Sequence, residues 1–206
     1  MREGGSVEVT APRRVSEREI RDFVAGKTAW LTKYMTLVPE KIKFQYVTGE
    51  IHHVFGKAYP LQVLLGPRDE AGISSGGELQ LVLRTKQRER EKVFKAGMKR
   101  ILLWEIEKQL EIWTKRMAIP ESRITGVTIR VMKSRWGSCR RVTGRFSFAL
   151  DLVTKPKECI EAVVVHELCH LFAAGHGPDF YARMETYLPD YKKRDRLLAS
   201  LPRELV

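Results

Sequence analysis

The stretch VVVHELCH, residues 163–170, contains the pattern His-Glu-x-x-His. On a helix, His166 and His170 lie on the same face, one turn apart, so both imidazoles can reach one metal ion. Glu167 lies about 100° further round the helix, where its carboxylate can take a proton from water without binding the metal. Because a divalent ion lowers the pKa of water towards neutrality, the stretch predicts a hydrolytic centre with Glu167 as general base.

The flanking residues predict the helix and a third ligand. Pro156 is suited to the first turn of a helix, and two glutamates follow near its positive end. His176 lies six residues after His170, too far round an unbroken helix to reach the same ion. Gly175 can supply the turn that brings it back, and Pro178 can start the next helix. A catalytic site has three protein ligands and one open position, so His166, His170 and His176 are the predicted metal ligands.

Working outward, hydrophobic periodicity predicts an α+β fold. Apolar residues alternate in residues 42–83, which predicts a meander of antiparallel strands, and again in two strands, 127–131 and 146–150. The segment RWGSC, residues 135–139, is too glycine-rich for the interior of an element, so a loop is expected there. The predicted strand and helices elsewhere are a strand at 7–10 and helices at 16–39, 85–117, 178–188 and 191–201, the first opened by a capping box of Ser16 and Glu19.

This order of elements predicts two lobes. Residues 1–84 form a β-rich N-terminal lobe with helices, and residues 85–206 form the lobe that holds the chemistry. A single continuous domain is the alternative.

Composition limits the partners and the compartment. Lysine and arginine number 37 against 25 acidic residues, a formal charge of +12. Such a surface attracts acidic substrates or nucleic acid, or it only keeps the protein in solution. The first twenty residues lack the apolar core of a signal peptide, and no apolar run is long enough to cross a bilayer. We therefore expect a cytoplasmic protein without a membrane partner, whose oligomeric state the sequence leaves open.

The remaining histidines and cysteines have structural interpretations. Three cysteines at these spacings do not indicate a disulfide framework, and Cys169 is expected to pack as a small apolar residue. His52 and His53 are expected to point to opposite faces of a strand.

The motifs together resemble the YgjP-like family of metallopeptidases, relatives of the SprT-like and WLM-type zincins. The resemblance is carried by residues 135–139, 163–170, 176–180 and 188–191, and more weakly by 49–61. It implies zinc on His166, His170 and His176, with Glu167 as the catalytic carboxylate. It also implies a zincin-like helix beside a small antiparallel sheet. Relatives commonly carry asparagine where this chain has Ala149, so a substrate contact made by that asparagine would be missing here.

Two further side chains are candidates for substrate contact. Arg135 could bind a carboxylate or phosphate, or stabilise an oxyanion, while its neighbour Trp136 is expected to shape a turn. Tyr181 is a possible oxyanion donor. An extended peptide would add to an edge strand, for which residues 144–150 are the candidate.

Three functions remain open at this point. A zinc peptidase is the leading hypothesis, with manganese, iron, cobalt or nickel as alternative metals. The same metal chemistry could cleave a nucleotide phosphoanhydride, or a protein attached to DNA as SprT-like relatives do, and basic stretches at 84–100, 130–145 and 192–196 would suit either substrate. A purely structural zinc ranks last, because such sites usually have four protein ligands.

Overall fold

The structure is a computed structural model that describes residues 9, 11, 12, 14–28, 43–86 and 89–205. The chain divides into two compact units, residues 1–42 and 43–206. In the first, helix α1 (Glu17–Ala25) begins with the predicted capping box: Ser16 Oγ accepts from Glu19 N, and the Glu19 carboxylate accepts from Ser16 N. Of the strand predicted at 7–10, Val9 alone belongs to the described residues. The part of the predicted helix beyond residue 28 also lies outside them.

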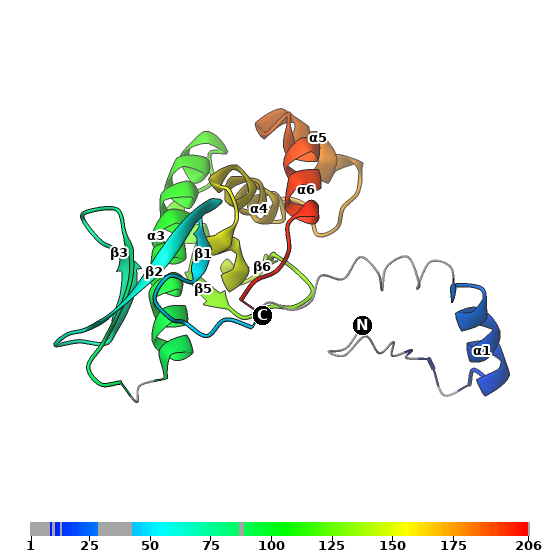
Figure 1. Ribbon diagram of the computed structural model, residues 1–206. Helices are drawn as coiled ribbons and strands as arrows, with labels where there is room; N and C mark the ends of the chain where they lie inside the picture. The colour runs from blue at the N-terminus through cyan, green and yellow to red at the C-terminus, as the bar shows by residue number, and fades with distance from the viewer. Residues whose placement is uncertain (1–8, 10, 13, 29–42, 87–88, 206) are drawn as a thin grey trace. The chain divides into compact units, whose positions relative to one another are not determined.

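The second unit opens with a four-stranded sheet of order β1-β2-β4-β3 (Figure 1). Its strands are β1 (Ile51–Val54), β2 (Lys57–Leu65), β3 (Glu70–Ile73) and β4 (Leu79–Leu83). β1 pairs with β2, and β3 with β4, in antiparallel fashion, but β2 and β4 are parallel. The predicted antiparallel meander is therefore wrong, because β3 takes the outer edge and β4 returns beside β2. The alternation at residues 44–46 is also not a strand, since Tyr46 has a φ of 54°.

The turn between β1 and β2 contacts the segment that leads into the later helices. Phe55 N donates to Val153 O at 2.7 Å, and Gly56 N donates to Thr154 O at 3.2 Å. Gly56 has a φ of 77°, and a Cβ there would stand 3.0 Å from Pro156. The hairpin tip is thus packed directly on the residue that precedes α4.

Helix α3 (Arg90–Arg116) is the long predicted helix, and it begins five residues later than expected. It contacts β3 and β4 of the first sheet, β5 of the second, and α4. Its buried stripe includes Phe94, Leu102 and Ile106. A Cβ at Gly97 would overlap the Ala71 carbonyl, so the glycine allows β3 to lie directly on the helix.

The second sheet has the order β5-β7-β6. Its strands are β5 (Gly126–Arg130), β6 (Gly137–Arg140) and β7 (Arg145–Ala149). β7 is parallel to β5 and antiparallel to β6, so the sheet is mixed and not antiparallel as the resemblance implied. Two further expectations are wrong. Residues 137–140 form a strand where a loop was predicted, and β7 is the central strand, so β6 provides an edge in place of residues 144–150.

The α-helices α4 (Lys157–Cys169), α5 (Pro178–Tyr187) and α6 (Tyr191–Ser200) match the sequence prediction closely. The short helices η1 (Glu121–Arg123) and η2 (Leu150–Thr154) were not predicted. α4 is almost wholly buried and contacts α3, α5, α6 and β6. The α+β class is confirmed. Among the described residues no helix combines the length and the apolar character that crossing a bilayer requires.

Buried polar contacts fix α4 along its length. Lys157 Nζ lies 2.7 Å from Oε2 of Glu105, which is 1% exposed on α3. Further along, Trp113 Nε1 donates to Glu161 at 3.1 Å, and Arg194 of α6 donates to the other oxygen of the same carboxylate at 2.5 Å. The helix that carries the His-Glu-x-x-His pattern is therefore held by both neighbouring helices.

One compact unit contains residues from both sides of the boundary predicted at residue 84. The first sheet contacts α3, and α3 contacts the second sheet. The division into lobes at 1–84 and 85–206 stays a prediction.

Candidate metal centre

Three imidazoles converge where α4 ends. His166 lies in the last turn of α4, His170 caps that helix, and His176 lies in the turn before α5. His166 Nε2 is 3.2 Å from His170 Nε2 and 3.0 Å from His176 Nε2. One ring nitrogen from each of the three histidines lies within 4.8 Å of the other two. In the described part of the chain this is the single place where three or more potential metal ligands of the His, Cys, Asp and Glu type come together.

The hydrogen bonds of these rings leave lone pairs at the centre. His170 Nδ1 lies 3.1 Å from Ala173 O. A carbonyl only accepts, so Nδ1 carries the proton and the lone pair of Nε2 faces the other rings. His166 Nε2 faces two other Nε2 atoms, and one proton there could serve only one of them. Burial, followed by the charges of His170 and His176, lowers the pKa of His166 to about 4, so its imidazole is neutral at physiological pH. The donor set therefore fits a divalent transition-metal ion.

Phe180 supports all three rings from one side. Its ring centroid lies 4.8 Å from that of His166 and 4.7 Å from those of His170 and His176. Phe180 is 1% exposed on the first turn of α5. Phe180 was not predicted to have a role, although it belongs to the segment that starts at His176. A large aromatic residue just after the third histidine is the signal that could have identified it.

Glu167 is a buried carboxylate beside this centre. It is 4% exposed, and its Oε2 has no hydrogen-bond partner among the described residues. Burial raises the pKa of Glu167 to about 8, and the positive charge of Arg135 acts in the opposite direction. An orphaned carboxylate oxygen in a buried position calls for a water, substrate or ion as its partner.

Gly137 forms the wall against which Glu167 lies. A Cβ at Gly137 would stand 2.5 Å from Glu167 Oε1 and 2.8 Å from its Cγ. The glycine of the RWGSC segment therefore permits a close approach between β6 and α4. Trp136 O accepts from Ala149 N at 2.8 Å, which joins this segment to the end of β7.

Residues 202–205, which we call the C-terminal strap, hold the loop before Gly137. Arg203 donates to Met132 O at 2.6 Å and to Arg135 O at 3.1 Å. Its guanidinium lies 3.7 Å from the ring centroid of Trp136. Arg203 thus fixes both ends of the loop that leads to Gly137.

The strap is itself anchored to buried polar groups. Asp151, which is 0% exposed, accepts from Glu204 N at 2.8 Å and from Leu205 N at 2.6 Å. The buried Lys155 ammonium donates to the Pro202 carbonyl and lies 3.5 Å from Glu204 Oε1. These groups sit on η2 and at the residue that follows it, just before α4.

The other candidate residues are spread around the centre. The Arg135 side chain is exposed and lies close enough to influence the pKa of Glu167. Tyr181 is 44% exposed, with its ring centroid 6.4 Å from that of His176. Ala149 is 0% exposed and offers no polar group to a substrate, and Cys169 is buried as expected.

The two histidines of β1 stand apart from this group. His52 is buried and lies 2.9 Å from Glu50 Oε2, whereas the half-exposed His53 lies 3.0 Å from Glu204 Oε2. The two rings have different environments and neither joins the metal-ligand group found in the described part of the chain.

Three imidazoles around a common point, with a buried carboxylate alongside, form the kind of centre found in metal-dependent hydrolases. The whole sequence agrees with this class. Residues 1–201 match the family described as YgjP-like, metallopeptidase domain. The chain belongs to this family and is a metal-dependent hydrolase of the metallopeptidase type.

Comparisons with proteins of curated description and with solved structures add little to the family match. No protein with a curated description matches the chain. Among solved structures, the crystal structure of the metallopeptidase zymogen of Pyrococcus abyssi abylysin aligns with 49% of this chain and 99% of its own, at 23% identity and a TM-score of 0.42.

Proposed function

We propose that this chain is a zinc-dependent peptidase in which His166, His170 and His176 bind the metal and Glu167 is the general base. The observation that carries the proposal is the convergence of three ring nitrogens within 4.8 Å of one another, with His166 Nε2 3.2 Å from that of His170 and 3.0 Å from that of His176. They lie next to a buried carboxylate with an unpaired oxygen among the described residues. Zinc suits three neutral imidazoles with an open fourth position. When bound, the ion supplies a Lewis acid that lowers the pKa of water and polarises a carbonyl oxygen.

The protein residues supply proton transfer and charge stabilisation. Glu167 takes a proton from the attacking water at its carboxylate and passes it to the leaving amine. Its contact with Gly137 holds the carboxylate in one place, so the proton acceptor is pre-positioned. Arg135, beside Glu167, and Tyr181, beside His176, are the candidates for stabilising the oxyanion.

A peptide substrate has a natural place along β6. Among the described residues this strand pairs with β7 alone, and Gly137 at its start touches Glu167. An extended peptide that adds to the free edge would pass directly beside the proposed catalytic carboxylate. β6 therefore replaces residues 144–150 as the candidate substrate strand.

The test is Glu167→Gln, with Glu158→Gln, an exposed glutamate on the same helix, as the matched control. Zinc content, measured by elemental analysis, and the melting temperature should match the wild type in both variants. Cleavage of an unfolded protein should fall at least about a hundredfold in Glu167→Gln and stay unchanged in Glu158→Gln. Full activity of Glu167→Gln would overturn the role of Glu167. Hydrolysis of nucleoside triphosphates in place of peptides would overturn the substrate class.

A further inference from the structure

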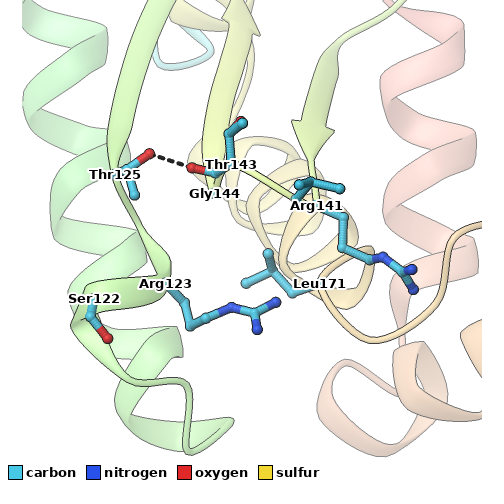
Figure 2. A pocket seen from close by; sticks show the side chains of 8 residues that line it. Ser122, Arg123, Thr125, Arg141, Thr143, Gly144 and Leu171 are labelled. Carbon is cyan, nitrogen blue, oxygen red and sulfur yellow. Dashed lines mark hydrogen bonds between the residues drawn. The ribbon is translucent and has the colours of Figure 1, made fainter.

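A cavity lies close to the metal centre, between η1, the β6–β7 turn and Leu171, the residue that follows His170. Its volume is about 460 Å³. Figure 2 shows the side chains around it, which come from three separate segments. The lining residues are Ser122, Arg123, Thr125, Arg141, Val142, Thr143, Gly144 and Leu171.

The backbone of this cavity is built by close contacts. Gly144 has a φ of 64°, and a Cβ there would overlap the Arg123 carbonyl, so η1 and the β6–β7 turn touch directly. Thr125 N donates to Gly144 O at 2.9 Å, and Thr125 Oγ1 donates to Thr143 O, as the dashed line in Figure 2 marks. The two segments that carry the arginines are therefore fixed relative to each other.

The cavity is positively charged. The guanidinium groups of Arg123 and Arg141 lie on either side of Leu171 in Figure 2. None of the eight lining residues is acidic. Neither Arg123 nor Arg141 has a carboxylate oxygen within 4.0 Å among the described residues. Arg194, by contrast, is ion-paired with Glu161.

The cavity lies next to the end of the proposed substrate strand. Leu171 directly follows His170, and Arg141 directly follows the last residue of β6. Burial, then the charge of Glu167, raises the pKa of the Cys139 thiol to about 11, while Arg123 acts in the opposite direction. Cys139 on β6 is thus within electrostatic reach of both the cavity and the carboxylate. Gly137 and Arg141 are four positions apart, a span of about 13 Å in an extended chain.

We propose that the cavity lined by Arg123 and Arg141 is a subsite that binds an acidic side chain of the peptide substrate, three or four residues from the bond that is cut. The inference rests on the proposed peptidase function. Guanidinium groups bind carboxylates through paired N–H donors. The occupant is a carboxylate that belongs to a peptide because Arg141 directly follows β6, along which the proposed peptide substrate would lie.

The test measures binding, so that it does not depend on cleavage. Fluorescent peptides that differ only in Glu or Gln, with the acidic position moved along an otherwise neutral sequence, are titrated against zinc-loaded protein carrying Glu167→Gln. At low ionic strength, fluorescence anisotropy should show three- to tenfold tighter binding for Glu at one or two adjacent positions, and about equal binding elsewhere, as expected for partly exposed charge pairs. Adding Arg123→Gln or Arg141→Gln should abolish this preference without weakening binding of the Gln peptides.

The matched control is Arg130→Gln, an exposed arginine of the same sheet that does not line the cavity. It removes the same net charge and should leave the preference intact. An equal loss in Arg130→Gln, a preference that is the same at every position, or no measurable peptide binding would overturn the proposal. So would a nucleoside triphosphate that binds through Arg123 and Arg141 while the acidic peptides do not. If the preference holds but wild-type protein cleaves no peptide, the proposed function fails and the subsite stands.

Discussion

At the residue scale, the position of the Glu167 side chain depends on Gly137, because any Cβ at residue 137 would overlap the Glu167 carboxylate. The carboxylate lies against the β6 backbone, and its Oε2 has no partner among the described residues. A methyl group at residue 137 would have to displace it. The position of the proposed base is therefore set by a residue that has no chemistry of its own.

Gly137→Ala should lower kcat at least about tenfold, because a misplaced catalytic group loses much of its rate. Overpacking should cost about 1–3 kcal/mol of stability. Zinc content should not change, since the three atoms nearest to a Cβ at residue 137 all belong to Glu167, which is not a proposed ligand. The control is Gly126→Ala on β5, where a Cβ would meet no heavy atom within 4 Å. Equal kcat for both variants, measured on one peptide, would show that Gly137 does not position Glu167.

The sequence was sufficient to predict where the three histidines lie. A helix places two of them one turn apart, and a glycine turn returns the third, so local rules settle their geometry. The roles of Phe180 and Gly137 were not predictable in this way. Both act through contacts with residues 4–30 positions away in sequence, which no local period reveals.

At the element scale, strand pairing was the main failure of the sequence prediction. Hydrophobic alternation located β4, β5 and β7, but it says nothing about neighbours, and two of the pairings are parallel. β6 was missed because its edge position tolerates a polar, glycine-rich sequence that a central strand would not. Because β6 was missed, residues 144–150 were predicted to be an edge strand that could bind substrate, although β7 is the central strand of the sheet.

The C-terminal strap is the element whose loss we expect to matter most for the loop before Gly137. Arg203→Ala removes two hydrogen bonds to backbone carbonyls and the stacking on Trp136, and should lower the free energy of unfolding by about 1–3 kcal/mol. The change in the free energy of unfolding is measured by urea denaturation, with Trp fluorescence as the signal. Arg196→Ala, an exposed arginine of α6 that donates to a single carbonyl of its own helix, should change stability by less than about 0.5 kcal/mol. Similar effects for the two variants would contradict the strap's role.

At the scale of the whole molecule, metal binding should stabilise the fold. The proposed ligands come from α4, its C-cap and the turn before α5, so an ion bound only by the folded state would add about 2.7 kcal/mol at a hundred times its Kd. Chelation should therefore lower the melting temperature and added zinc should restore it. His176→Ala should reduce this difference in calorimetry. An unchanged zinc response of His176→Ala would remove His176 from the ligand set.

Acid should destabilise the protein through His52. Burial lowers the pKa of this imidazole, and the neighbouring Glu50 only partly offsets it. The unfolded chain therefore binds a proton near pH 6.5 while the folded chain does not, so stability is full above that pH and falls as the pH drops below it. Urea denaturation of chelated protein between pH 7.5 and about 5 measures how stability changes with pH in the wild type and in His52→Gln. His166 and His170, whose pKa values are also lowered, act in the same direction as His52, and Glu167, whose pKa is raised, acts in the opposite direction, but these three are the same in both proteins. The wild type should therefore lose more stability than His52→Gln, or gain less, as the pH falls. Identical slopes would exclude His52.

Because the Phe55–Gly56 turn packs on Pro156, the β1–β2 hairpin should tolerate few insertions or substitutions at its tip. An inserted residue or an affinity tag at the tip would push against the start of the helix that carries His166. The turn around Gly77 faces open space, since a Cβ there meets nothing within 4 Å. Length variation and tags are therefore better tolerated at Gly77 than at Gly56, although both turns sit in the same sheet.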